Sequence, residues 1–145
     1  MTETSAIRAI DSLCANEFAL EIDGERVSGI FRISGLQTFK LDEEGNRVRS
    51  PFIVSKMVQR DGNNAFNKWL RETVAATGDK RPTRSVAIVA IDDGVETRRW
   101  TAEGAWISEV HYSDFDSASF EMVEEVYTIH YDKLVESWPA TENLE

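Results

Sequence analysis

The chain has 145 residues and a mass of 16.4 kDa, which is the size of one domain. Charged residues make up 29% of it, and 26 acidic against 16 basic residues give a formal net charge of −10. Generic nucleic-acid binding is therefore disfavoured, because binding phosphates needs clustered Lys and Arg. A single cysteine excludes an intrachain disulfide bond. We expect no membrane segment and no signal peptide, since no apolar run approaches about 18 residues and residues 1–13 lack a basic and an apolar region.

The first regular pattern follows an N-terminal arm, expected over residues 1–15. Phe18, Leu20 and Ile22 alternate with mostly acidic residues, which predicts a half-buried strand with one apolar and one acidic face. The dipeptide at 23–24, Asp-Gly, predicts a hairpin turn. Further strands are expected over 27–33 and 52–60, with a polar loop at 41–50 between them.

One segment changes to the period of a helix. Its apolar or half-apolar residues recur at intervals of three and four: Phe66, Trp69, Leu70, Thr73 and Val74. Residues 61–64 offer capping side chains before it, and Gly78 is a natural stop after it. The spacing predicts one amphipathic helix of about four turns whose apolar side covers a sheet.

Strands resume after the helix. Residues 86–91 are continuously apolar and predict a strand buried on both faces, followed by a hairpin turn at 92–94. Separate strands are expected over 95–100 and 105–112, a loop over 113–119, and a last long strand over 120–131. The expected fold is a single domain, 1–145, that is mainly β: an antiparallel β-barrel or sandwich with one amphipathic α-helix and a C-terminal tail over 136–145.

The sequence contains no constellation typical of an enzyme. His111 and His130 show no metal-binding spacing, and Cys14 lacks a nucleophile context and is expected to be a small buried or interfacial residue. Glu124 and Glu125 are neighbours on an expected strand and so point to opposite faces. We therefore expect no catalytic residue, no cofactor and no metal.

Asp114 and Asp116 do not match the spacing of a calcium loop, and the glycines form no nucleotide-binding motif. The sequence has four tryptophans, Trp69, Trp100, Trp106 and Trp138, which serve either core packing or a subunit interface.

An ordered set of motifs resembles the tail-tube proteins of contractile phages and related contractile injection systems. The set covers residues 16–134. It begins with F-A-L-E-I-D-G (18–24), G-I-F (29–31) and S-G-L (34–36), followed by R-D-G (60–62) and F-N-K-W-L (66–70). It continues with D-G (93–94), Trp100 and A-W (105–106), and it ends with S-F (119–120), Glu124 and His130. The order of the motifs agrees with the strand, helix and strand pattern derived above. The chain departs from the family pattern at three places. In the family the segment after S-G-L is often longer and reaches the next ring. A proline usually follows A-W, where this chain has Ile107, and a glutamate usually follows the histidine, where this chain has Tyr131.

The resemblance implies a structural, non-enzymatic subunit of an inner tail tube. Such subunits form hexameric rings that stack into a hollow conduit for DNA or protein cargo, which passes without specific binding. The implied partners are copies of the chain itself, a surrounding sheath, and baseplate and tail-terminator proteins, with no membrane. The implied location is a virion tail or an extracellular or cytoplasmic injection particle, made in the bacterial cytoplasm.

The acidic side of the first strand is a candidate for the channel wall of such a tube. A negative channel repels DNA phosphates, and Glu17, Glu21 and Asp23 lie away from the apolar face of that strand. We expect these three residues to face the channel, Glu21 above all. The alternative is that this strand lies on the outer layer, because a period of two does not say which face is inside.

Other functions stay open at this point. The short segment 37–50 leaves open a tube initiator at the baseplate or a ring protein of the type VI secretion kind. A monomeric β-barrel that binds a small ligand is a more distant alternative.

Overall fold

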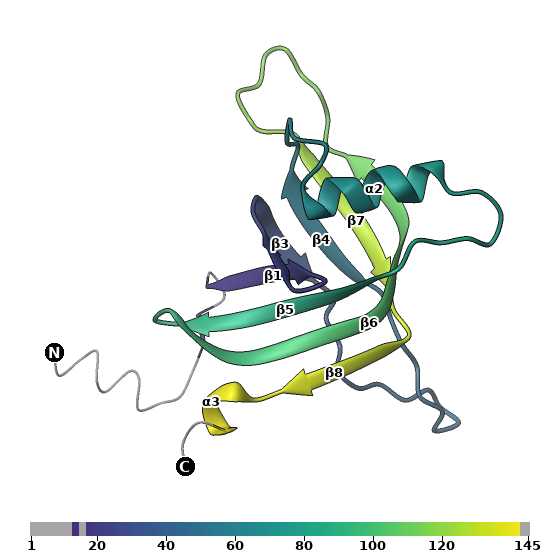
Figure 1. Cartoon of the computed structure of the whole chain (residues 1–145), viewed down its shortest axis with the longest axis vertical. Coiled ribbons are helices and arrows are strands. Elements are labelled where there is room, and N and C mark those ends of the chain that lie inside the picture. Colours follow the sequence, from purple (N-terminus) through teal and green to yellow (C-terminus); the bar gives the residue numbers. More distant parts are fainter. Residues whose placement is uncertain (1–12, 15–16, 143–145) are drawn as a thin grey trace, which may run out of the picture.

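The computed structural model describes residues 13–14 and 17–142, and it shows a bent antiparallel sheet with one long helix beside it (Figure 1). The elements in chain order are β1 (Phe18–Ile22), β2 (Glu25–Val27), β3 (Ile30–Ser34), β4 (Phe52–Met57), α2 (Ala65–Ala75), β5 (Arg84–Asp92), β6 (Val95–Tyr112), β7 (Glu124–His130), β8 (Lys133–Ser137) and α3 (Pro139–Glu142). The mainly β antiparallel fold with one amphipathic helix is thus confirmed, with the very short α3 in addition.

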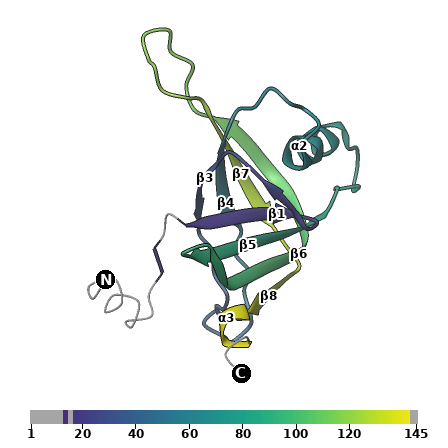
Figure 2. The ribbon, with the colours of Figure 1, turned by 60° about the vertical axis from the view of Figure 1, so that its left-hand side comes forward.

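The sheet is a single surface of eight strands that turns around the core. Its order is β2-β1-β5-β6-β7-β4-β3, and β8 pairs with β6 beside this path. Strand β6 has 18 residues and belongs to both halves: residues 95–105 pair with β5 or β8, and residues 106–112 pair with β7. Figures 1 and 2 show the resulting change of direction, which brings the two halves face to face.

The bend in β6 lies at Gly104, whose φ is +66°. This left-handed backbone suits glycine because a side chain there is strained. A methyl group at this position would also collide with the carboxylate of Asp132, directly after β7. The glycine therefore allows the strand to turn from one half of the sheet to the other.

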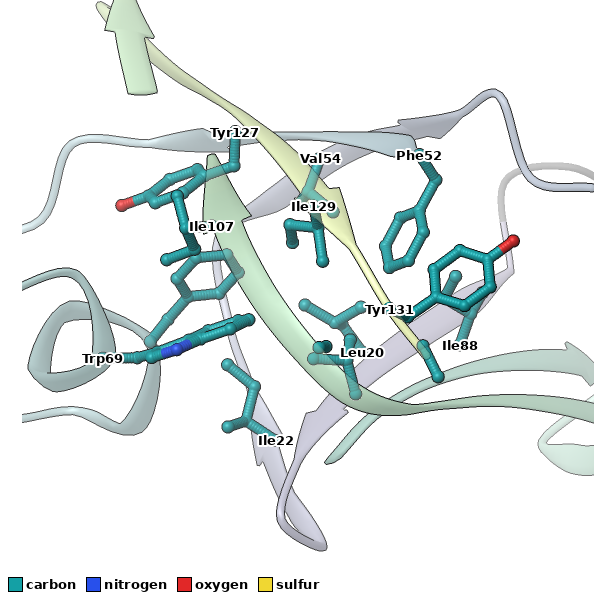
Figure 3. Packing of buried hydrophobic residues seen from close by; sticks show 14 residues of the cluster. Leu20, Ile22, Phe52, Val54, Trp69, Ile88, Ile107, Tyr127, Ile129 and Tyr131 are labelled. Atoms are coloured by element: carbon teal, nitrogen blue, oxygen red, sulfur yellow. The ribbon is translucent and has the colours of Figure 1, made fainter. Parts of the chain in front are cut away.

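The core lies between the two halves and is filled from both (Figure 3). Leu20, Val86 and Ala102 come from one half, and Val54 and Ile129 come from the other, all fully buried. The alternation predicted for the first strand is confirmed, since Leu20 and Ile22 point inward. The continuously apolar segment at 86–91 is β5, and its Val86 to Val89 are buried whichever face they occupy.

Helix α2 covers the part of the core near Tyr127. Asn64 caps its first turn by accepting a hydrogen bond from the backbone N–H of Asn67. Phe66 and Trp69 are buried, with the Phe66 ring centroid 4.5 Å from that of Tyr127. The indole N–H of Trp69 donates to the carbonyl of Pro82, which ties the helix to the segment before β5. The helix has 11 residues, about three turns rather than the expected four.

Four of the expected strands have different bounds in the structure. The expected strand 27–33 is interrupted at Gly29, which has a φ of +85° and separates β2 from β3. The expected strands 95–100 and 105–112 are one strand, because the glycine at the bend keeps the ladder continuous. The expected strand 52–60 ends at Met57.

The last predicted strand, 120–131, was wrong at its beginning. Strand β7 starts at Glu124, and residues 113–123 form a long loop whose Phe120 is fully exposed. Alternation alone cannot distinguish an exposed loop from a strand in this segment. Strand β8 was not predicted because adjacent Leu134 and Val135 break the period of two.

The expected N-terminal arm lies largely outside the described residues, and part of the expected C-terminal tail is β8 and α3. In the described part of the chain, neither helix is long and apolar enough to span a membrane.

Candidate assembly surfaces

Glu21, the residue expected most strongly to face a channel, lies on the face of β1 that is turned away from the core. Its carboxylate binds Arg99 of β6, with Oε1 2.7 Å from the guanidinium, and Arg26 of β2 at 3.3 Å. Arg99 also binds Glu96, with Nε 2.8 Å from Oε2. These four side chains form a network of two acids and two bases across three strands, which we call the wall cluster.

The wall cluster holds its acids in the charged form. Hydrogen bonds from Arg99 lower the pKa of both Glu21 and Glu96, against a smaller opposing effect of burial. The two carboxylates in turn raise the pKa of Arg99. The cluster therefore stays ionised and balanced at neutral pH, and Glu21 brings no unpaired negative charge to this face.

The other two candidate carboxylates lie just beyond the two ends of β1 and bind residues at the two ends of β5. Glu17 accepts a hydrogen bond from the backbone N–H of Asp93 at 3.0 Å, in the turn between β5 and β6. Asp23 accepts one from the backbone N–H of Ser85 at 2.8 Å, and its other oxygen lies 3.8 Å from Nε of Arg84. The structure thus places the three acids along one strand but gives each a different partner.

We call the outward face of β1, β2, β5, β8 and the first half of β6 the wall face; it carries mainly small or ion-paired side chains, with Lys133 and Val135 of β8 as exceptions. Ala87 and Val89 are buried at its centre although they lie outside the main core. Around them are Thr97, Thr101 and the wall cluster. Val135 of β8, the cross-strand partner of Thr101, is 38% exposed and adds one apolar side chain to this otherwise mostly polar or small-residue face.

The sheet has edges that the chain does not close. Among the described residues, β3 pairs only with β4 and β8 pairs only with β6. Unpaired strand edges are templates for pairing with another chain. Beside β8, Trp138 is about half exposed and its ring lies 3.8 Å from the guanidinium carbon of Arg98.

A shallow apolar groove runs between β1 and β3, where the sheet is open. It has a volume of about 280 Å³. Its lining is apolar except for Arg32 and consists of Phe18, Phe31, Arg32, Ile33, Leu36 and Ile88. The open edges and this groove leave backbone hydrogen-bonding groups and apolar area that the described part of the chain does not cover.

A buried ion pair was not foreseen from the sequence. Lys56 of β4 and Glu125 of β7 are cross-strand partners, with Nζ 2.7 Å from Oε1, and both are buried. Tyr127 donates its hydroxyl hydrogen to the same Oε1 at 2.9 Å, and burial together with this carboxylate raises the pKa of Tyr127. Glu125 therefore points inward, toward the core side of β7. Only the register of β4 on β7 reveals its partner.

The residues considered for chemistry do not converge. His111 lies beside Glu109 on an exposed strand end, with 3.0 Å between Nδ1 and Oε2. His130 stacks on Trp106 with 4.5 Å between ring centroids. Cys14 is exposed, so the buried reading was wrong and the interfacial one stays a prediction. The part of the chain that the structure describes holds no group of three or more metal-ligating side chains.

Comparison with protein families gives one match that covers most of the chain. The model of the family "T4-like virus tail tube protein gp19" matches residues 14–135. No curated protein sequence matches.

Solved structures with the same fold include tube components of contractile machines. A chain of the sheath-tube complex of the PVC extracellular contractile injection system is 16% identical, with a TM-score of 0.73, and 93% of this chain and 97% of that chain are covered. A chain of the anti-feeding prophage cap is 18% identical, with a TM-score of 0.71 and coverage of 88% and 91%. Hcp1 from Flavobacterium johnsoniae is 12% identical, with a TM-score of 0.56 and coverage of 84% and 95%.

Proposed function

Because the chain belongs to the T4-like virus tail tube protein family, we propose that it assembles with copies of itself into hexameric rings that stack into the inner tube of a contractile phage or phage-like injection system. The family makes the chain a structural tail tube protein and not an enzyme, as the sequence analysis expected. The match over residues 14–135 is the observation that carries the proposal, since it spans almost every described element.

The shape of the subunit supports lateral assembly. A ring needs each copy to offer two different edges, and β3 and β8 are edges that the described chain leaves unpaired. Closing the ring satisfies the backbone groups of both edges and covers the apolar groove between β1 and β3. Trp138, half exposed beside β8, is suited to burial in the same contact.

We propose that the wall face lines the channel, which places Glu17, Glu21 and Asp23 toward it. Side chains that are mostly small, or that form ion pairs within the subunit, suit a conduit through which cargo passes without binding. Helix α2 lies on the side of strands β1 and β5 that is opposite to the wall face (Figure 2). It therefore lies toward the outside of the tube, where a sheath would surround it. Baseplate and terminator proteins would contact the terminal rings, and DNA or protein would be the cargo.

The proposal is tested by the state of the purified full-length chain. We expect rings or tubes in negative-stain electron micrographs and a sedimentation coefficient far above that of a 16.4 kDa monomer at neutral pH. A species that stays monomeric at all concentrations would contradict self-assembly and would favour a ligand-binding barrel.

A second candidate is a ring protein of the type VI secretion kind. The fold shared with Hcp1 from Flavobacterium johnsoniae favours it, although the TM-score of 0.56 is below the 0.73 found for the tube complex. Isolated rings that do not stack even at high concentration would support this alternative, whereas long tubes would support the tail tube.

A further inference from the structure

Two surface features lie at opposite ends of the subunit and complement each other. The first is the loop of residues 113–123 between β6 and β7, which we call the apical loop; it projects beyond the rest of the chain at the top of Figures 1 and 2. The second is a pocket near the start of β8, which we call the basal pocket, beside the loop that joins β3 to β4 at the lower end of Figure 1.

The apical loop is held in a defined shape by its own hydrogen bonds. The side chain of Asp116 accepts from the backbone N–H of Ala118 at 2.9 Å, and its carbonyl accepts from Ser119 at 3.0 Å. At the base of the loop, Ser113 and Glu124 are joined by two hydrogen bonds, of 2.8 and 3.0 Å. These bonds form one turn within the loop and join its two ends.

That surface is apolar and acidic. Phe115, Phe120 and Met122 are 79%, 104% and 59% exposed, so the chain leaves Phe120 uncovered and most of Phe115 and more than half of Met122 open. The loop also carries Asp114, Asp116 and Glu121 and contains no Lys or Arg. Two uncovered aromatic rings on an ordered loop are typical of an interface, where aromatic residues are enriched.

The basal pocket has the opposite charge. Its volume is about 460 Å³, and it is lined by Gln37, Thr38, Arg47, Val48, Arg49, Tyr131, Asp132, Lys133 and Leu134. Three of these residues are basic and one is acidic. Among the described residues, Arg49 and Lys133 have no ion-pair partner, and the exposed Phe39 and Leu41 add apolar surface nearby.

The positions of the two features exclude contact within one subunit and suit contact between subunits. They lie at opposite ends of the long axis, so an apical loop reaches a basal pocket only in another copy (Figure 1). A contact between two different surfaces of identical chains is head-to-tail, and when it does not close on itself it generates an open stack.

We propose that the apical loop of one copy inserts its aromatic side chains into the basal pocket of the copy above it, and that this contact joins successive rings. Phe115 and Phe120 supply the apolar anchors, while Asp114, Asp116 and Glu121 face Arg47, Arg49 and Lys133. The inference rests on the proposed tube function and adds the residues that stack its rings.

Chemical cross-linking tests the contact directly. In the full chain with Cys14→Ser, we combine Phe115→Cys in the apical loop with Thr38→Cys at the basal pocket and add a short bismaleimide. Because each copy then carries both halves of the contact, we expect a ladder of dimers, trimers and longer species in denaturing gels. Each single-cysteine variant should give no ladder.

Two control pairs decide between the possible surfaces. Phe115→Cys with Val74→Cys, on the exposed side of α2, should give no ladder. Phe115→Cys with Phe31→Cys reports insertion into the groove between β1 and β3 instead. A ladder from the Phe31 pair and none from the Thr38 pair would overturn the proposal.

Charge exchange gives an independent test. Arg47→Glu with Arg49→Glu should leave rings intact but reduce stacks at least tenfold in micrographs. Adding Asp114→Lys with Glu121→Lys should restore them, because these two side chains make none of the hydrogen bonds within the loop described above. Asp79→Lys, on an exposed loop elsewhere, is the matched control and should have no effect. Unchanged stacking in the Arg variant would refute the contact while leaving the tube function in place; a wild-type chain that forms no rings at all would refute the tube function itself.

Discussion

Lys56 and Glu125 are the two charged side chains that are buried in the described part of the chain. Both are buried, and the carboxylate also accepts a hydrogen bond from Tyr127, so each charge has a specific partner. Taking two charges out of water is costly, and their attraction offsets that cost only while both are present. The pair favours the observed register of β4 on β7, because a shift by one residue would turn one of the two side chains to the outer face and leave the other charge buried without its partner.

Removal of one partner should therefore cost more than removal of both. We expect Lys56→Met to lower the free energy of unfolding by about 3–5 kcal/mol, because Glu125 is then buried without a counter-charge. The double variant Lys56→Met with Glu125→Gln should lose less than Lys56→Met alone, since the glutamine still accepts from Tyr127. Urea unfolding followed by circular dichroism measures both values.

The matched control is the more exposed pair of Arg84 and Glu72, 2.8 Å apart, where Arg84→Met should cost no more than about 1 kcal/mol. If the effects of Lys56→Met and Glu125→Gln simply add, the two charges are not coupled and the account of their role is wrong.

Single residues differ in how far the sequence reveals them. Leu20, Ile22, Phe66 and Trp69 were assigned to the core from periodicity, because a local pattern determines which side of an element is apolar. The Lys56–Glu125 pair and the wall cluster depend on register between strands that are far apart in sequence. No local pattern contains that information.

Among the elements, β6 carries the largest share of the architecture. It pairs with β5, β7 and β8, and it changes halves of the sheet at Gly104. In the sequence, Gly104 lies between two expected strands, and a glycine at such a position predicts that the first strand ends before the second begins. The structure shows a bend instead, because glycine alone accepts the positive φ and leaves room for Asp132.

Substitution at this bend should be costly for two separate reasons. Gly104→Ala combines a left-handed backbone with a collision against Asp132. We expect it to lower the free energy of unfolding by more than the about 1–3 kcal/mol that a strained backbone alone costs. Gly94→Ala, which also has a positive φ but open space around it, should cost only the backbone part. Adding Asp132→Ala to Gly104→Ala should recover the difference in thermal unfolding. Equal costs for the two glycines would show that the collision is relieved without strain.

Helix α2 is held mainly by Trp69. Its side chain is fully buried, and its indole N–H donates to Pro82 at 2.9 Å. Trp69→Ala should lower the free energy of unfolding by about 3–5 kcal/mol through the cavity that it leaves. Trp69→Phe should cost less, because it keeps most of the buried area and loses chiefly the hydrogen bond.

Val74 on the exposed side of the same helix is the control, and Val74→Ala should change the free energy of unfolding by less than about 0.5 kcal/mol. A subunit that folds normally with Trp69→Ala but no longer forms rings would place this side chain in an interface rather than in the core.

At the scale of the whole molecule, the subunit is built from two kinds of surface. Its ends carry an acidic apical loop and a basic basal pocket, and its sides carry the open edges of β3 and β8. The sequence predicted the architecture because alternation and helical period are local signals. It predicted the first part of the apical loop, 113–119, but assigned 120–123 to the following strand. It did not predict the basal pocket, because that pocket brings together residues 37–49 and 131–134.

A tube also needs one face of each subunit turned inward, and we propose the wall face for this position. Its acidic residues are Glu17, Glu21, Asp23, Glu96 and Glu103, and its basic residues are Arg26, Arg99 and Lys133. The wall cluster is balanced within itself. Any surplus of negative charge on this face therefore comes from acids outside the cluster, Glu17 and Asp23 among them.

We predict that the assembled tube has a weakly negative channel lined by the wall face, with Glu21 bound to Arg99 on its surface. In a Cys14→Ser background, Thr101→Cys beside the wall cluster should react in tubes with small N-ethylmaleimide but not with a long polyethylene-glycol maleimide, which enters a narrow channel poorly. Val74→Cys on α2 should react with both reagents, because it lies toward the outside. Rapid reaction of Thr101→Cys with the long reagent would place the wall face outside. A cryo-electron microscopy map of the tube separates the two parts of the prediction: a neutral or basic inner wall contradicts the charge, and Glu21 on the outer surface contradicts the placement.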